Sequence, residues 1–313
     1  MIPEIIWTYW NDIELPEFIS NCIETWRFHN PYHIINILNE NNFTNFCKYD
    51  IKSHKHYDKS KPAFMSDMIR LDLLKNYGGI WMDASIICLK PLKFKKDTKC
   101  FMYYKNNTNG LIYQKFPILE SWFIACSKNN KFISSWHSEF IFKMENYETL
   151  SSYKQSNNDG LLREWKSTYF VVYSAVQSVL NKYYLDGENP EIILKNAVKD
   201  GPYKHQIYIH VGLLFDANKC KEIFNTTSPM IKFTSNHRKI IEKCDVSSWF
   251  DNLFKKEHMD NTLYMEDIGN NDGLVNGDYP YTHIDNTIKV SFIWSIFIFL
   301  IILICISIIL SRN

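Results

Sequence analysis

The first forty residues alternate between a strand, a helix and a second strand, and this order restricts the fold more than any other feature of the chain. Residues 5–10 form a short run of apolar, aromatic and β-branched residues, which is typical of a buried strand. A helical pattern that begins at Pro16 places three apolar residues on one face: Ile19, Ile23 and Trp26. Residues 33–38 then predict another strand. A β-α-β unit of this kind is the signature of an α/β fold with a parallel sheet.

A second helix-to-strand unit carries the polar residues on which the functional prediction depends. Residues 62–77 have a helical pattern with a proline in the first turn, and the glycine pair at 78–79 ends it. The apolar residues 80–82 predict a buried strand, and Asp83-Ala84-Ser85 is the turn that leaves it. Further strands are predicted at 101–104, 122–126 and 230–234, and further helices at 131–144, 167–183 and 218–224. We expect residues 1–250 to form one α/β domain.

An uncharged apolar run occupies residues 290–310. About 20 apolar residues in a helix span a bilayer, so this run predicts a single C-terminal transmembrane helix, with Lys289 and Arg312 at its ends. A buried core helix is the alternative, but such a helix normally keeps one polar face. The first residues lack the basic start of a signal peptide, so we expect a tail anchor with the folded domain on the cytosolic face. The acidic residues 251–289 predict a solvated linker to that anchor.

The composition argues against several other functions. The formal net charge is +1, so no nucleic acid or other polyanion is predicted as a partner. The eight cysteines form no CxxC pair, and their spacing suits neither a zinc site nor a disulfide framework, so we expect reduced thiols. His54 and His56 lie in a polar and basic stretch at 51–61. A metal site there would need a third ligand close by in the sequence, and a solvated loop is the preferred interpretation.

Three charged residues of the second unit are candidates for a binding site. Asp67 and Arg70 are three residues apart on the predicted helix, so they share a face, and the neighbouring leucines should draw that face toward the sheet. By itself, the pair is most simply an intrahelical ion pair. Asp83 follows the C-terminal end of a buried strand, where ligands bind in open α/β sheets, although a turn aspartate often bonds only its own backbone. The three residues indicate a site only in combination.

That combination belongs to a long composite motif. It consists of Ser66-Asp67-x-x-Arg70 followed by Tyr77-Gly78-Gly79-Ile80-Trp81-Met82-Asp83-Ala84-Ser85. The motif resembles the capsular polysaccharide synthesis family of glycosyltransferases, and it is similar to the wider DXD-containing glycosyltransferase family 32. Residues 2–10 and 22–31 resemble the beginning of that family, and residues 121–125 and 228–234 match it more loosely. The resemblance covers roughly residues 2–235.

The resemblance implies a GT-A-like, Rossmann-type domain that binds a nucleotide sugar. A UDP-sugar would be the donor, with Mn²⁺ or Mg²⁺ as the cofactor. A glycan, lipid or protein would be the acceptor, in polysaccharide or glycan biosynthesis near a membrane. The wider family also implies transfer with retention of the anomeric configuration.

The resemblance also implies roles for individual residues. Asp67 and Arg70 would hold hydroxyls of the donor sugar, and Asp83 would hold the ribose or the metal, so these three form the expected catalytic group. Lys232 would reach the diphosphate. The donor's base would stack on a tryptophan, Trp10 or Trp7, and strand alternation puts these two indoles on opposite faces, so at most one of them points at any given ligand.

The chain departs from the family pattern at three positions. The third position of the DXD element is Ser85, and a hydroxyl is a poorer ligand than a carboxylate for Mn²⁺ or Mg²⁺. Ile231 stands in place of a histidine, and Thr168 in place of an aspartate. These departures keep open an alternative in which the protein binds a nucleotide sugar or glycan as a membrane-tethered protein without catalysis. A metal-dependent phosphohydrolase that uses Asp83 is a weaker possibility, because few other acids or histidines lie near it in the sequence.

Overall fold

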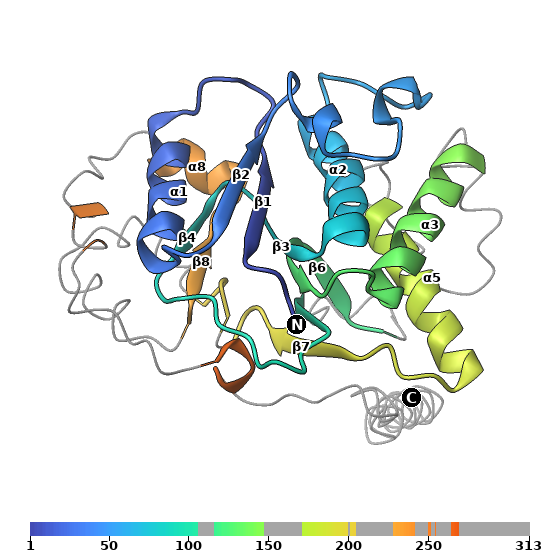
Figure 1. Ribbon diagram of the computed structural model, residues 1–313. Helices are drawn as coiled ribbons and strands as arrows, with labels where there is room; N and C mark the ends of the chain where they lie inside the picture. Colours follow the sequence, from blue (N-terminus) through green and yellow to red (C-terminus); the bar gives the residue numbers. More distant parts are fainter. Residues whose placement is uncertain are drawn as a thin grey trace, which may run out of the picture. The chain divides into compact units, whose positions relative to one another are not determined.

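A mixed sheet of six strands lies at the centre of the computed structural model, with the strand order β2-β1-β3-β6-β5-β7 (Figure 1). The structure describes residues 1–105, 116–146, 171–199, 201–204, 228–241, 250–251, 254 and 264–268. The strands of this sheet are β1 (Ile5–Tyr9), β2 (Ile34–Leu38), β3 (Gly79–Met82), β5 (Cys100–Lys105), β6 (Ile118–Cys126) and β7 (Ile192–Asn196).

The direction of the strands only partly follows the sequence prediction. β1 is parallel to both β2 and β3, as the β-α-β pattern predicts, and β5 is parallel to β7. β6 is antiparallel to its neighbours β3 and β5, so the prediction of a parallel sheet is wrong for this part of the fold. No helical pattern separates β5 from β6 in the sequence, and consecutive neighbouring strands without a crossover helix pair in antiparallel fashion.

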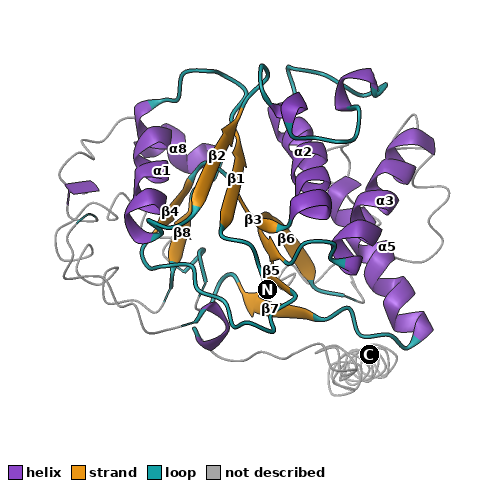
Figure 2. Cartoon of the chain, viewed as in Figure 1, coloured by secondary structure: helices purple, strands orange, loops and turns teal. Residues whose placement is uncertain are grey.

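Helices lie on both sides of the sheet (Figure 2). α1 (Glu17–His29) and α8 (Ser235–Ile241) lie on one side, whereas α2 (Pro62–Tyr77), α3 (Lys131–Asn146) and α5 (Val171–Asp186) lie on the other. Beside α1, β4 (Ile86–Cys88) and β8 (Met230–Lys232) form a second, two-stranded antiparallel sheet that pairs Ile86 with Lys232. The indole of Trp26 on α1 donates to the carbonyl oxygen of Ile86 at 2.6 Å and fixes the helix against this small sheet.

α2 is buried along most of its length, and this burial determines the environment of its charged residues. Every residue from Phe64 to Leu74 is buried, so α2 has no solvent-facing polar stripe over these turns. α2 is therefore packed inside the protein on all sides over this stretch, although it is not apolar all round. The three charged residues of this stretch are therefore buried too: Asp67, Arg70 and Asp72.

The glycine pair between α2 and β3 allows a close approach of two backbones. Gly78 has φ +67° and Gly79 has φ +94°, a region that residues with a side chain rarely adopt. A Cβ at Gly79 would lie 2.6 Å from the carbonyl oxygen of Ile5, and one at Gly78 would lie 2.6 Å from the amide nitrogen of Lys128. The turn therefore needs glycine at both positions to bring β3 beside β1.

Most predicted elements are present within the described residues. The predicted strand at 122–126 is the second half of β6, and the predicted helix at 167–183 corresponds to α5, which is described from Val171. β7 and α8 are elements that the sequence analysis does not predict. The predicted helix at 218–224 lies outside the described residues. The polar stretch before α2 contains one short 3-10 helix, η2 (Ile51–Ser53), and a similar turn, η1 (Phe43–Asn45), precedes it.

One part of the predicted linker is packed into the folded unit. The 3-10 helix η5 (Met265–Asp267) contains Met265, which is 1% exposed and belongs to the main hydrophobic core together with Ile268. The Glu266 carboxylate accepts hydrogen bonds from the Lys95 amide at 3.0 Å and from the Thr98 hydroxyl. The expectation of a solvated linker over 251–289 is therefore wrong for residues 264–268, because two apolar side chains and a buried carboxylate anchor them.

The remaining expectations concern the membrane span and the cysteines. None of the helices in the described part of the chain is both long and apolar enough to cross a bilayer, and residues 290–310 lie outside that part. The five cysteines that the structure describes are free thiols: Cys22, Cys47, Cys88, Cys100 and Cys126.

Candidate active site

Asp83 lies directly after β3, at the carboxyl end of the parallel strands. Its backbone amide donates to the carbonyl oxygen of Trp122 on β6 at 2.9 Å, which holds the turn against the neighbouring strand. The indole nitrogen of Trp81 donates to Asp83 Oδ1 at 3.1 Å. The Asp83 side chain remains 29% exposed, so one side of it is open to solvent at the edge where open α/β sheets bind ligands.

α2 brings Asp67 and Arg70 to the same place. Arg70 Nη1 lies 3.1 Å from Asp67 Oδ1, and Arg70 Nη2 lies 3.3 Å from Asp83 Oδ1. The Nη2 group also donates to the Ser66 hydroxyl at 2.8 Å, and the guanidinium carbon lies 5.0 Å from the Trp81 ring centroid. The Arg70 side chain is 4% exposed, and these contacts let it join the two carboxylates in a fixed geometry.

The two carboxylates of this network differ in their protonation. Burial raises the pKa of Asp67 to about 7; the Arg70 guanidinium opposes this shift, and the charge of Asp83 adds to it. Burial alone would also raise the pKa of Asp83, but the Lys232 ammonium and the Arg70 guanidinium outweigh it and hold that pKa below its ordinary value. Asp83 is therefore ionised at neutral pH, whereas Asp67 can exchange a proton near pH 7.

Lys232 reaches the site from β8, 149 residues further along the chain. Its ammonium donates to Asp83 Oδ2 at 2.8 Å and to the Ser85 hydroxyl at 3.1 Å. Ser85 in turn donates to the carbonyl oxygen of Phe233 at 2.8 Å, and the pairing of β4 with β8 fixes this register. The structure thus brings Lys232 together with the three residues of the composite motif: Asp67, Arg70 and Asp83.

The ammonium of Lys232 lies between Asp83 and Ser85, the pair expected to hold a divalent metal. Asp83 Oδ1 already accepts hydrogen bonds from Arg70 and Trp81, and Asp83 Oδ2 accepts one from Lys232. Ser85 is 3% exposed, and its hydroxyl donates to the carbonyl oxygen of Phe233. Among the described residues, no group of three or more histidine, cysteine, aspartate or glutamate side chains is arranged to hold a metal ion. The donor set, with two cations within 3.3 Å of Asp83, does not fit a Mn²⁺ or Mg²⁺ site.

The two candidate tryptophans have different surroundings. Trp7 is 3% exposed, its indole donates to the carbonyl oxygen of Gly78 at 3.0 Å, and its ring packs against Phe46, so both its edge and its face are used in the core. Trp10 follows the carboxyl end of β1, on the same sheet edge as Asp83, and is half-buried. The guanidinium carbon of Arg238 lies 5.6 Å from its ring centroid. Of the two indoles, Trp10 is the one placed near the polar cluster.

Sequence reasoning missed several residues that line or support this site. Glu120 on β6 is 6% exposed and accepts hydrogen bonds from the Trp122 indole at 2.8 Å and the Tyr203 hydroxyl at 3.3 Å. Burial raises the pKa of Glu120 to about 7, with nearby Lys105 opposing the shift. Glu120 and Trp122 are two positions apart on a strand, so their side chains point to the same face of the sheet. This alternation is the signal in the sequence that could have linked Glu120 to the site.

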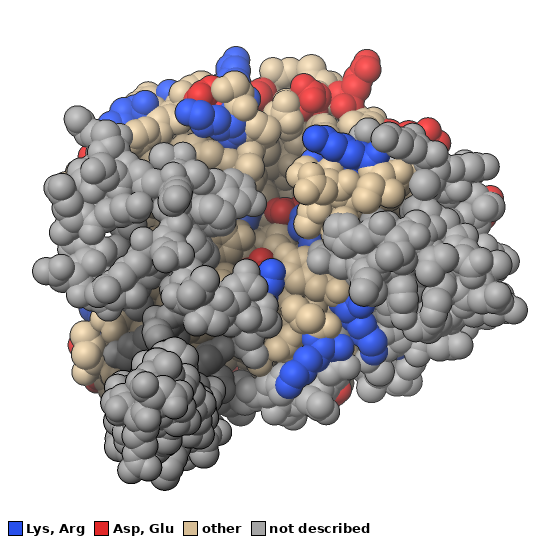
Figure 3. Space-filling view, turned by 180° about the vertical axis from the view of Figure 1, so that it is seen from behind, with Lys and Arg blue, Asp and Glu red and all other residues tan. Residues whose placement is uncertain are grey.

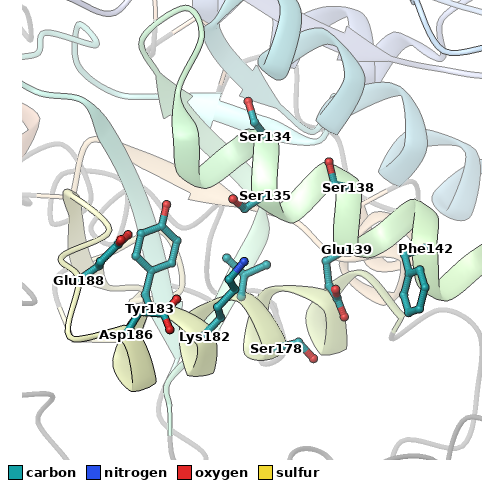
Figure 4. Close-up of a pocket in the computed structure, with 11 residues that line it drawn as sticks. Ser134, Ser135, Ser138, Glu139, Phe142, Ser178, Lys182, Tyr183, Asp186 and Glu188 are labelled. Atoms are coloured by element: carbon teal, nitrogen blue, oxygen red, sulfur yellow. The ribbon is translucent and has the colours of Figure 1, made fainter.

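Charged side chains of both signs gather in a hollow on the face opposite to that of Figure 1 (Figure 3). A separate cavity of about 600 Å³ lies between α3 and α5 and is lined by serines, Lys182 and several carboxylates (Figure 4). No residue of the Asp83 network lines that cavity. Buried charged groups that contact one another are a stronger indication of a functional site than the polar lining of the α3–α5 cavity. We therefore take the Asp83 network as the candidate active site.

His54 and His56 lie together, with ring centroids 5.6 Å apart, on the loop that precedes α2. Burial lowers the pKa of His54, and the neighbouring His56 adds to this shift. The described residues supply no third ligand that would make a metal site there. The pair belongs to the packing of the loop, next to Tyr49.

Comparisons with solved structures give glycosyltransferases. The PaToxG glycosyltransferase is 16% identical, with 81% of this chain and 87% of that chain covered and a TM-score of 0.36. The UDP-bound glycosyltransferase domain of the YGT toxin is 11% identical over 80% and 96% of the two chains, with a TM-score of 0.40. The galactosyltransferase LgtC, in complex with donor and acceptor sugar analogues, is 9% identical over 80% and 95%, with a TM-score of 0.39.

A search of curated protein sequences finds no match. The family comparison gives a definite result, because the profile described as "Capsular polysaccharide synthesis protein" matches residues 1–253, which include every element of the Asp83 network. The chain therefore belongs to the capsular polysaccharide synthesis protein family.

Proposed function

We propose that the protein is a glycosyltransferase that moves a sugar from a nucleotide-sugar donor to a hydroxyl of a glycan, lipid or protein. The observation that carries this proposal is the convergence of Asp67, Arg70, Asp83 and Lys232 into one bonded network at the carboxyl end of β3. The membership of the chain in a capsular polysaccharide synthesis family supports the same class of reaction. On this proposal, the sheet and its helices form a GT-A-like donor domain.

In the proposed reaction, the bond between the anomeric carbon and the diphosphate oxygen breaks. A new bond forms between that carbon and the acceptor oxygen. A nucleoside diphosphate leaves with the bonding electrons, and the proton of the acceptor hydroxyl passes to this leaving diphosphate or to solvent. The sugar passes through a cation-like state while the diphosphate gains negative charge. A site for this reaction therefore needs fixed positive charge near the leaving group and a rigid clamp on the sugar.

The network around Asp83 offers both the fixed positive charge and the rigid clamp. Asp67 and Arg70 would hold sugar hydroxyls, since the helix fixes them 3.1 Å apart and their burial keeps them in place. Asp83 would hold the ribose, because its partly exposed carboxylate is the acceptor most open to solvent in the network. Lys232 would face the diphosphate and take the place that a metal ion has in other sites of this chemistry, since its ammonium already lies against Asp83.

The nucleobase would stack on Trp10, and a UDP-sugar is the proposed donor. The acceptor would be reached near a membrane, to which residues 290–310 would tether the domain from the cytosolic side.

The test uses the full-length chain, purified in a mild detergent, and a panel of nucleotide sugars. Release of nucleoside diphosphate is measured for the natural protein, for Asp83→Asn and for Glu24→Gln, which removes an exposed carboxylate on α1 as a matched control. We expect one donor to be hydrolysed or transferred, with a loss of at least about 100-fold in Asp83→Asn and no change in the control. Thermal unfolding of each variant verifies that it is folded.

Two results would contradict the proposal: no donor is consumed, or Asp83→Asn is as active as the natural protein while folded. A second candidate function is donor binding without turnover, and the engagement of both Asp83 oxygens by Arg70, Trp81 and Lys232 favours it. Calorimetry separates the two functions, since binding of a nucleotide sugar with no release of product indicates a binding protein.

A further inference from the structure

Arg238 lies beside the candidate site but takes no part in the network around Asp83. It is the fourth residue of α8 and is half-buried, with its guanidinium over the Trp10 ring. Within the described part of the chain, no carboxylate forms an ion pair with this guanidinium, which contacts the Trp10 ring. Because no described carboxylate pairs with it, the Arg238 guanidinium is available to bind an anionic ligand.

The position of Arg238 is fixed by the first turn of α8. The Thr234 hydroxyl accepts a hydrogen bond from the His237 amide at 3.4 Å, and His237 Nδ1 accepts one from the Thr234 amide at 3.1 Å. This reciprocal pattern is that of a capping box, with histidine in the role usually taken by glutamate. His237 is 1% exposed, so the turn is locked into the protein. Arg238 is thereby held a few residues after Lys232 on one rigid segment.

The other cations of the site already have carboxylate partners. Arg70 contacts Asp67 and Asp83, and Lys232 contacts Asp83. The five charged groups considered are Arg70, Lys232, Arg238, Asp67 and Asp83, and together they carry one positive charge, or two when Asp67 is protonated. Burial lowers the pKa of Lys232 and Asp83 opposes this shift, while the charges of Arg238 and Arg70 lower it further, which places Arg238 within electrostatic range of the network.

We propose that Arg238 is a diphosphate-binding residue, whose guanidinium leaves the Trp10 ring and contacts the phosphates of the donor. This inference rests on the proposed function, because it concerns the leaving group of a nucleotide-sugar donor. The contact with Trp10 is easily exchanged, since a cation–π contact at a partly exposed site is weaker than a charge-assisted hydrogen bond to a phosphate. The same movement uncovers the aromatic face on which the base would stack, so the two halves of the donor would bind cooperatively.

The test compares Arg238→Gln with Arg238→Lys and with Lys239→Gln, a control that removes an exposed charge from the adjacent residue of α8. Binding of inorganic pyrophosphate, UDP and uridine to the full-length chain is measured by calorimetry at low ionic strength. In Arg238→Gln we expect roughly 10- to 100-fold weaker binding of pyrophosphate and UDP, whereas uridine should bind no more weakly than to the natural protein, because the Trp10 face is then uncovered. Arg238→Lys should recover part of the affinity, and Lys239→Gln should bind as the natural protein does.

The outcomes separate this inference from the proposed function. If Arg238→Gln binds pyrophosphate and UDP as tightly as the natural protein, or if Lys239→Gln loses as much affinity, the role of Arg238 is refuted even when donor turnover is observed. If pyrophosphate binds through Arg238 but no nucleotide sugar is bound or consumed, the proposed function fails and the anion site stands. If the natural protein binds neither pyrophosphate nor UDP, both are refuted. A fluorescence change on adding pyrophosphate that is absent in Trp10→Phe would further support release of the ring.

Discussion

The contact between Lys232 and Asp83 joins β8 to the acidic turn after β3, so its strength tests the whole site. Lys232→Met removes the ammonium 2.8 Å from Asp83 Oδ2 and keeps most of the side-chain volume. At that distance and an effective dielectric constant of about 20, the attraction is about 6 kcal/mol. Removal of both charges from water offsets most of it, and hydrogen bonds between charged groups contribute about 1.5–3 kcal/mol net. We therefore expect a coupling free energy of about 2 kcal/mol between the two residues.

A double-mutant cycle measures this coupling. The free energy of unfolding at pH 7 is determined by urea denaturation for the natural protein, Lys232→Met, Asp83→Asn and the double variant. Each single variant should lose about 2–3 kcal/mol, and the double variant should lose little more than one of them, because the second change no longer breaks the contact. Glu24→Gln combined with Asp83→Asn is the control, because exposed Glu24 pairs with Arg27 outside this network, and it should give a coupling below about 0.5 kcal/mol.

The pH dependence of the coupling follows from the depressed pKa of Asp83. A carboxyl group whose pKa is lower in the folded than in the unfolded protein stabilises the fold fully above its unfolded value, which is near 3.8. That stabilisation is lost as the pH falls through the lower pKa of the folded state. The coupling should therefore be constant between pH 5 and 7 and should shrink below about pH 4. A coupling under about 0.5 kcal/mol at pH 7, or one that grows on acidification, would refute the arrangement of these side chains.

Other predictions follow from individual contacts. If Lys232 supplies the cation beside Asp83, EDTA should reduce donor consumption by less than about twofold, and Mn²⁺ should not restore donor consumption by the Lys232→Met variant. A complete loss of activity with EDTA would contradict this interpretation of the site. Gly79→Ala should lower the free energy of unfolding by about 2–4 kcal/mol in urea titrations, because its Cβ would lie 2.6 Å from the Ile5 carbonyl oxygen at φ +94°. Gly187 also has a positive φ but has open space around it, so Gly187→Ala should lower the free energy of unfolding by less than about half as much. Met265→Ala should cost about 2–4 kcal/mol and should increase proteolysis after residue 260, and stability equal to the natural protein would show that residues 264–268 are not anchored in the core.

The sequence by itself determined the local units of the fold. The start of α2 is marked by a proline in its first turn, and its end by the glycine pair that allows the sharp turn into β3. Both signals can be read from the sequence because they depend only on local backbone conformation. The motif around these residues also identified Asp67, Arg70 and Asp83 as a group, since residues three apart on a helix share a face. The missing helix between β5 and β6 indicates that these two strands are antiparallel, but no local pattern predicts that β6 also pairs with β3, a strand that precedes β5 in the chain, because that pairing exists only in the folded chain.

Only the tertiary structure decided how the charges of the site are used. Lys232 reaches Asp83 across 149 residues because β4 pairs with β8, and no local pattern encodes that register. The result is that the Lys232 ammonium lies against both Asp83 and Ser85, and that burial raises the pKa of Asp67 whereas the Lys232 and Arg70 cations lower the pKa of Asp83. Charge and protonation depend on solvent exclusion and on distant partners, which exist only once the chain has folded.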